Sequence, residues 1–100
     1  MARMNHAVVF APEARDDFRA LRAYDRAAVR DAINTHLSRR PIRVSKSRIK
    51  RLRGLGRPQY RLRVGDLRVF YDVHETEVHV LAIVLKQFAP QWLKRWGEEP

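Results

Sequence analysis

The chain has 100 residues, of which 45% are hydrophobic, so it can form one domain with a modest core but not two. The absence of cysteine excludes disulfides, thiol nucleophiles and cysteine-ligated zinc. The net charge of +10 at pH 7 indicates a polyanionic partner.

The amino-terminal half predicts a strand followed by two helices. His6–Ala11 is a short apolar run typical of a strand, and Pro12 suits the first turn of a helix, where its missing N–H costs nothing. Asp25 is a good N-cap for a second helix, in which apolar residues recur four apart. We expect this helix to end near Arg39 or Arg40, just before a proline. We therefore expect a helical hairpin.

The segment Pro41–Gly56 carries most of the excess charge and has no clear period. From Arg39 to Arg63 the chain has eleven Lys and Arg residues and no acid, whereas the remainder has ten basic and eleven acidic residues. We expect a loop with at most one turn of structure and with its basic side chains facing solvent. Such a stretch favours nucleic acid over a membrane surface, because few large apolar residues are available for insertion.

Two alternating runs, Tyr60–Val64 and Leu67–Val73, predict a β-hairpin. Gly65-Asp66 joins them, and such a pair favours a two-residue turn of type I′ or II′. This turn places Val64 opposite Leu67, which fixes the register of the two strands.

The hairpin register gathers three arginines on one face of the sheet. Arg63 falls opposite Arg68 and Arg61 opposite Phe70, and like charges that face each other across a ladder are destabilising. An anion would neutralise them, and guanidinium groups bind phosphate oxygens bidentately. The hairpin alone fits a phosphate site and a solvated polar face about equally well.

Glu77–Leu85 predicts a last strand that is central and covered on both sides in its later half. One face is predicted to carry Val78, Val80, Ala82 and Val84, and the other Leu81 and Ile83. A proline-led helix follows, with an aromatic side that we interpret as core cover, formed by Trp92, Leu93 and Trp96. The element order predicts an α+β fold, β-α-α-β-β-β, in which the helical hairpin packs on a mostly antiparallel sheet.

This order resembles the RelE/ParE toxin superfamily of bacterial type II toxin–antitoxin systems, as do four motifs: A-x-x-D-F-x-x-L in the first helix, L-R-G before the hairpin, Y-R-L-R-V-G-D-L-R-V-F-Y within it and V-H-V-L-A-I-V after it. The resemblance covers about Val8 to Leu93 and is most specific over Leu52–Val73. It implies a microbial-ribonuclease-like fold over a single domain, residues 1–100, and a cognate antitoxin. RelE-like members cut mRNA in the ribosomal A site, whereas ParE-like members poison DNA gyrase.

For RelE-like chemistry, the resemblance assigns three residues to the scissile phosphate: Arg61, Arg63 and Arg68. It places Lys86 or Gln87 at a further position that is usually basic, but Gln87 carries no charge and the Trp92-Leu93 region replaces the family's carboxy-terminal tyrosine. Lys86 is the candidate acid. No residue is a firm candidate for the base, because an arginine with a pKa above about 12 is a poor proton acceptor. The expected grip on the RNA backbone consists of Lys46, Arg48, Lys50, Arg51 and Arg53.

Three functions stay open at this point. The first is a metal-independent, ribosome-dependent mRNA endoribonuclease, the second a gyrase inhibitor without nuclease activity, and the third a binding module that has lost its toxic activity. An acidic, partly disordered antitoxin that covers the arginine face is expected in each.

No cofactor, metal or membrane partner is expected. The amino terminus lacks the apolar core of a signal peptide, and Val80–Leu85 is too short to span a bilayer, so we expect a soluble, cytoplasmic protein. Tyr60 and Tyr71 are expected on the sheet face opposite the arginines. The histidines lack metal-ligand spacing and are expected in structural or surface roles: His6, His36, His74 and His79.

Overall fold

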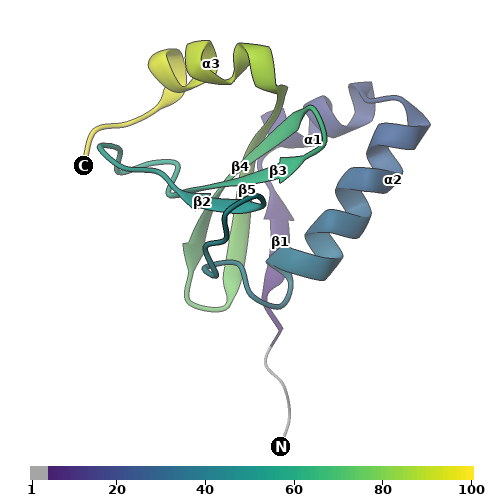
Figure 1. The fold of residues 1–100 in the computed structure, drawn as a ribbon, viewed down its shortest axis with the longest axis horizontal. Coiled ribbons are helices and arrows are strands. Elements are labelled where there is room, and N and C mark those ends of the chain that lie inside the picture. Colours follow the sequence, from purple (N-terminus) through teal and green to yellow (C-terminus); the bar gives the residue numbers. More distant parts are fainter. Residues whose placement is uncertain (1–4) are drawn as a thin grey trace, which may run out of the picture.

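The computed structural model describes residues 5–100 and has the expected α+β architecture (Figure 1). Its single sheet has the strand order β1-β5-β4-β3-β2, with the strands β1 (Ala7–Phe10), β2 (Ile49–Arg51), β3 (Tyr60–Val64), β4 (Leu67–His74) and β5 (Glu77–Leu85). β1 runs parallel to β5, and the other neighbours are antiparallel.

Three α-helices cover this sheet: α1 (Pro12–Ala20), α2 (Ala23–Ala32) and α3 (Ala89–Trp96). A π-helical turn, η1 (Ile33–Leu37), extends α2, and a 3-10 turn, η2 (Lys86–Phe88), leads into α3. Within residues 5–100, no helix is long and apolar enough to cross a membrane.

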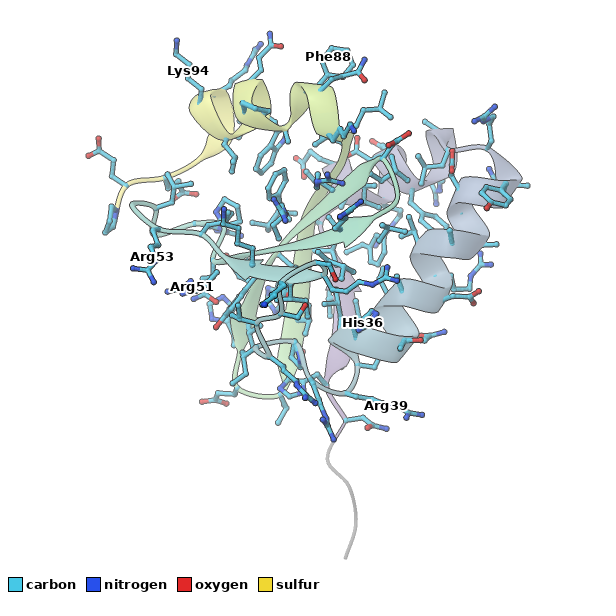
Figure 2. All side chains as sticks on the ribbon, viewed as in Figure 1. His36, Arg39, Arg51, Arg53, Phe88 and Lys94 are labelled. Carbon is cyan, nitrogen blue, oxygen red and sulfur yellow. The ribbon has the colours of Figure 1, made fainter. Side chains whose placement is uncertain are left out.

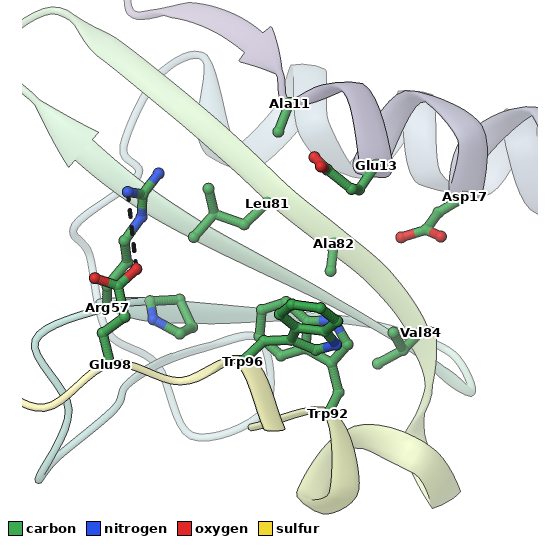
Figure 3. A pocket seen from close by; sticks show the side chains of 11 residues that line it. Ala11, Glu13, Asp17, Arg57, Leu81, Ala82, Val84, Trp92, Trp96 and Glu98 are labelled. Atoms are coloured by element: carbon green, nitrogen blue, oxygen red, sulfur yellow. Dashed lines mark ion pairs between the residues drawn. The ribbon is translucent and has the colours of Figure 1, made fainter. Parts of the chain in front are cut away.

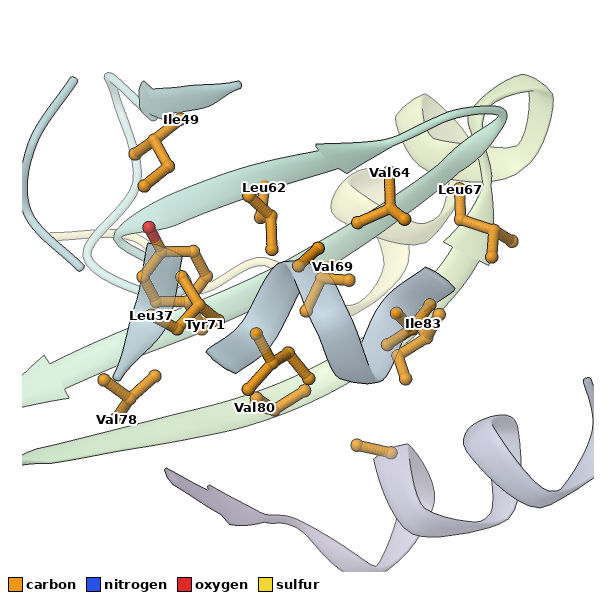
Figure 4. Packing of buried hydrophobic residues seen from close by; sticks show 14 residues of the cluster. Leu37, Ile49, Leu62, Val64, Leu67, Val69, Tyr71, Val78, Val80 and Ile83 are labelled. Atoms are coloured by element: carbon orange, nitrogen blue, oxygen red, sulfur yellow. The ribbon is translucent and has the colours of Figure 1, made fainter. Parts of the chain in front are cut away.

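The two faces of the sheet carry cores of different size. On the face covered by α1, α2 and η1, Figure 4 shows a cluster of 14 buried residues that includes Leu37, Leu62, Val69 and Val80. On the other face, Phe70 and Ala82 of the sheet and Ala89 of α3 form a smaller buried cluster, with partly buried neighbours that include Trp92 and Leu93. Because burying apolar area is the main stabilising contribution, most of the folding free energy comes from the first face.

The central hairpin has the predicted register. Val64 pairs with Leu67, Arg63 with Arg68 and Arg61 with Phe70. Gly65 has φ +57°, a conformation that costs glycine little, while Asp66 keeps a negative φ, which is the pattern of a type II′ turn.

The segment Pro41–Gly56 contains a strand where we expected only a loop. Ile49–Arg51 forms β2, an edge strand that pairs antiparallel with β3, so the observed order is β-α-α-β-β-β-β-α. Three residues are too few to show a period, and the pairing is decided by the backbone of β3.

The second helix begins and ends earlier than predicted. Its N-cap is Arg22, not Asp25, which lies inside the first turn with its carboxylate 3.8 Å from Arg22 Nε. An acidic residue in the first turn still complements the positive helix end. The helical turns stop at Leu37, and Pro41 is buried rather than serving only as a helix breaker.

The residues of β5 do not keep the alternation that we predicted. Phe70 pairs with Ala82 but Tyr71 pairs with Val80, so Leu81 is an extra residue in a β-bulge. The bulge turns Ile83 to the main core, together with Val78 and Val80, and turns Ala82 and Val84 toward α3. The carboxy-terminal part of β5 thereby gains an apolar face on which α3 packs.

Candidate functional site

The basic face of the hairpin combines close like charges with partial burial. Arg61, Arg63 and Arg68 lie on one face, as the register requires. Burial lowers the pKa of Arg61 from its usual value, and the charges of Arg68 and Arg63 lower it further. Tyr60 and Tyr71 lie on the opposite face, where their rings stack at 5.5 Å.

Two of these arginines, Arg61 and Arg68, border a cavity of about 590 Å³, which we call the hairpin pocket. Its four basic side chains come from four elements: Lys50 (β2), Arg61 (β3), Arg68 (β4) and Lys86 (η2). No acidic residue lines it. Its apolar wall includes Phe70, against which Trp92 of α3 stacks with 4.9 Å between ring centroids and 5° between planes.

One nitrogen of the Arg61 guanidinium, Nε, lacks a hydrogen-bond partner. This nitrogen is buried and is one of two buried side-chain polar atoms in residues 5–100 without a hydrogen bond; the other is His6 Nδ1. An unmet buried donor is costly, and here it belongs to a cation held beside two others. This combination indicates a group that is completed by an anion.

Arg68 and Lys86 are tied to the hairpin turn. Arg68 Nη1 donates hydrogen bonds of 2.9 Å to the carbonyl oxygens of Gly65 and Leu67. The Lys86 N–H donates to the Asp66 carbonyl at 2.8 Å, and Lys86 Nζ lies 3.8 Å from an Asp66 carboxylate oxygen. Asp66 therefore does more than fill the turn, because it brings the end of β5 to the hairpin.

The structure divides the predicted RNA grip. Lys50 pairs with Arg61 and joins the hairpin pocket. Arg51 lies on the opposite face, where it donates to the Gln59 carbonyl at 3.0 Å and sits 5.0 Å over the Tyr60 ring. Arg48 borders a separate pocket beside η1. The remaining two, Lys46 and Arg53, are exposed, and Figure 2 shows Arg53 near Arg51 at the β2 side of the molecule.

Proton acceptors are scarce at this site. Tyr71 is unsuited to the role, because burial raises the pKa of its hydroxyl, Tyr60 raises it further, and the hydroxyl donates to the Pro41 carbonyl at 2.6 Å. His79 hydrogen-bonds Glu77 at 3.0 Å and lies beside His74, the last residue of β4. Residues 5–100 hold no group of three or more potential metal ligands.

A buried carboxylate, that of Asp72, holds the segment that follows α3. Asp72 is 3% exposed, accepts the Gln59 N–H at 2.7 Å and binds Arg57 Nε at 3.0 Å. Arg57 also exchanges backbone hydrogen bonds with Glu98. The segment after α3 is thereby fixed to the start of β3.

Helix α3 also lines a mainly apolar groove of about 500 Å³, together with residues of α1 and β5 (Figure 3). Trp92 and Trp96 form one wall, and the ion pair between Arg57 and Glu98 closes one end. The arginines of the hairpin do not line this groove, so we interpret it as part of the packing of α3.

Comparison with known proteins identifies the family. The profile described as "ParE toxin of type II toxin-antitoxin system, parDE" matches residues 8–87. In the RelBE2 toxin–antitoxin complex of Mycobacterium tuberculosis, the similar chain is 30% identical, with coverage of 81% of this chain and 98% of that one and a TM-score of 0.66.

Two further solved structures share the fold. The RelE–RelB complex of Pyrococcus horikoshii OT3 is similar at 22% identity, covering 86% of this chain and 100% of that one with a TM-score of 0.69. A mutant of Escherichia coli RelE in the free state is similar at 20% identity, covering 93% and 99% with a TM-score of 0.68. A search of curated proteins finds no match. The chain belongs to the RelE/ParE superfamily and is a toxin of a type II toxin–antitoxin system.

Proposed function

We propose that this toxin is a ribosome-dependent mRNA endoribonuclease that acts in the cytoplasm and is neutralised by a cognate antitoxin. The observation that carries the proposal is the hairpin pocket, in which four cations converge with no acid and one guanidinium nitrogen lacks a partner. A purely structural cluster of this kind would be destabilising, whereas a phosphate group satisfies it.

The reaction we assign to the pocket is attack of an RNA 2′-oxygen on the adjacent phosphorus. The new O–P bond forms as the bond from phosphorus to the 5′-oxygen breaks, which leaves a 2′,3′-cyclic phosphate and a 5′-hydroxyl. Negative charge grows on the phosphate oxygens, where Arg61 and Arg68 are placed to stabilise it. Arg63 adds to the positive potential from the exposed edge.

Proton transfer accounts for the proposed dependence on the ribosome. The 2′-hydroxyl proton must leave and the 5′-oxygen must gain one, yet no carboxylate or imidazole lines the hairpin pocket. We assign the donor role to Lys86, which lines the pocket and is exposed. The acceptor would be water or a group of the ribosome.

The proposal is tested by primer extension on a translated mRNA in a reconstituted translation system. Wild type should produce new ends within translated codons, only when ribosomes are present. Arg68→Ala should reduce their rate about 10²–10³-fold, by analogy with the loss of one charge-stabilising donor. Arg19→Ala, which removes an exposed charge of α1, is the matched control and should cleave like wild type. Intact mRNA at a toxic dose of wild type would contradict the proposal.

Two observations support an antitoxin as partner: the positive charge of the hairpin face and the presence of antitoxins in similar structures. The Mycobacterium tuberculosis and Pyrococcus horikoshii structures are toxin–antitoxin complexes. For this chain we propose an acidic partner segment that folds over the hairpin face and competes with RNA for the same cations.

The family profile favours a second candidate, since it is that of ParE toxins. As a ParE-like inhibitor, the chain would block DNA gyrase without cutting RNA. A supercoiling assay with purified gyrase separates the two: inhibition that persists in Arg68→Ala supports the gyrase function, and undisturbed supercoiling at excess toxin excludes it.

A further inference from the structure

A second basic cavity lies beside η1, on the other side of β2 from the hairpin pocket. This loop pocket measures about 590 Å³ and is formed by the end of η1 and the segment that leads into β2. Figure 2 shows His36 and Arg39 toward the lower end of α2, well apart from Arg51 and Arg53. No acidic residue lines the pocket, and its arginines are Arg39, Arg40, Arg43 and Arg48.

These four guanidinium groups are free of protein counterions. None forms an ion pair within 4.0 Å in the described part of the chain. Burial lowers the pKa of His36, which lines the same pocket, and the Arg48 charge lowers it further. The arginines of the loop pocket therefore disfavour the protonated form of His36, and a bound anion would favour it; Asp25, Asp31 and Asp66 line the adjoining cavity that His36 and Arg48 also border.

The walls of the loop pocket are held in place by the fold. The Ser45 side-chain oxygen accepts the N–H groups of Arg48 and Ile49 at 3.0 and 3.2 Å, and the Ser45 N–H donates to the Ile49 carbonyl at 2.9 Å. At the other end, the Pro41 carbonyl receives the buried Tyr71 hydroxyl. The chain path around the pocket is therefore set without a ligand, which lowers the entropic cost of binding one.

The two basic pockets are neighbours along β2. Arg48 lines the loop pocket and Lys50 the hairpin pocket, and the Arg48 carbonyl accepts the N–H of Arg63 at 2.8 Å. One strand of nucleic acid that crosses this edge of the sheet would therefore meet both.

We propose that the loop pocket binds backbone phosphates of the same RNA strand whose neighbouring segment enters the hairpin pocket, an inference that rests on the proposed function. Guanidinium groups and the hydroxyls of Thr35, Ser45 and Ser47 suit phosphate oxygens. The lining itself offers a ligand little apolar surface, because its one apolar residue, Ile49, is 3% exposed; the exposed side chains of Ile42 and Val44 lie outside the lining.

The proposal is tested by fluorescence anisotropy with a single-stranded RNA of about 12 nucleotides, a length of the order of known single-strand sites, at several salt concentrations. Arg39→Gln/Arg43→Gln should weaken binding about 10- to 30-fold near 0.1 M salt and reduce the salt slope by about 1.4, the value for two lost single-strand contacts. Arg15→Gln/Arg19→Gln removes equal charge from exposed positions of α1 and should change affinity and slope far less. Equal losses in the two double variants would overturn the proposal.

A second readout needs no variant. The imidazole of His36 is followed by NMR through a pH titration, with the RNA oligonucleotide, with inorganic phosphate or with polyglutamate. We expect RNA to raise the pKa of His36, since bound phosphate offsets Arg48, and polyglutamate of equal charge to do so less. An effect of polyglutamate without one of RNA would assign the pocket to an acidic protein and refute the RNA assignment.

The outcome is separable from that of the proposed function. Arg61→Gln should reduce cleavage about 10²–10³-fold while the His36 response to RNA persists, because Arg61 lies in the other pocket. Absence of cleavage by wild type, with the RNA response of His36 intact, would remove the nuclease function and leave the phosphate site.

Discussion

The two faces of the sheet differ in how completely their groups are satisfied. The face under α1 and α2 buries 14 residues and pairs its buried hydroxyl, that of Tyr71, with a carbonyl. The face packed against α3 has a hydrophobic cluster of three buried residues, Phe70, Ala82 and Ala89, and keeps a buried Arg61 nitrogen without a partner. The first face combines a large apolar core with a paired hydroxyl, whereas the second leaves a buried cation unpaired. Such a local departure from stability is expected at a functional site, which is where our proposal puts it. Substitutions on the two faces should therefore separate stability from activity.

The largest loss of stability is expected from Leu62→Ala, on the fully buried side of β3. Loss of a core side chain of this size costs about 2–5 kcal/mol through lost burial and a residual cavity. Urea unfolding measures this cost, and Arg63→Ala, the next residue on the exposed side, serves as the control with a change within about 0.5 kcal/mol. Equal costs would contradict the division between the faces.

A smaller loss is expected from Asp72→Asn, because the amide would turn a donor toward Arg57 Nε. The side chain is almost fully buried but Arg57 is 47% exposed, so we expect about 1–3 kcal/mol. Glu98→Gln, at an exposed pair 4.0 Å long, should change stability by less than about 1 kcal/mol. If the ion pair between Asp72 and Arg57 holds α3, amide hydrogen exchange in this helix should become faster in Asp72→Asn but not in Glu98→Gln.

Tyr71→Phe should cost about 1–2 kcal/mol, since it leaves the buried Pro41 carbonyl without its donor. The effect should extend to the loop pocket: the NMR resonance of His36 should shift and RNA affinity should fall moderately. Tyr60→Phe, at the partly buried partner of the Tyr71 ring, is the control. A melting temperature equal to that of wild type would show that the loop is not anchored through this bond.

The smallest effect concerns Asp17, whose carboxylate accepts the Ile83 N–H at 3.0 Å. Burial raises the pKa of Asp17, and Asp16 and Glu13 also raise it, so its charged form destabilises the fold. Stability should improve slightly as pH falls through this raised pKa toward the usual aspartate value of about 3.9. In Asp17→Asn this component should vanish; an unchanged pH profile of thermal unfolding would contradict the assignment.

The sequence was most informative where local rules decide the structure. Gly65-Asp66 permits one tight turn, and alternation then sets the register of the three hairpin arginines, which the structure confirms. The parallel β1–β5 pairing and the central place of β5 agree with the expected, mostly antiparallel sheet. Pro12 also marks the start of α1 as predicted.

The remaining features depend on distant partners. β2 has three residues and exists because β3 offers a free edge, so the placement of Lys50 in the site and Arg51 outside it has no local signal. The bulge at Leu81 reverses the faces of Ala82 and Ile83, since α3 and the main core compete for the end of β5. Asp72 alternates like a surface residue, but Arg57 and Gln59 make its burial tolerable.

The most direct test of this account compares Arg61→Ala with Leu62→Ala, two neighbours on opposite faces of β3. For each variant, cleavage of ribosome-bound mRNA per folded molecule is measured on a sample whose free energy of unfolding is known. We predict that Arg61→Ala loses about 10²–10³-fold in cleavage without loss of stability, and that Leu62→Ala loses stability while its folded fraction cleaves normally. Full cleavage by a folded Arg61→Ala would contradict the assignment of the hairpin pocket.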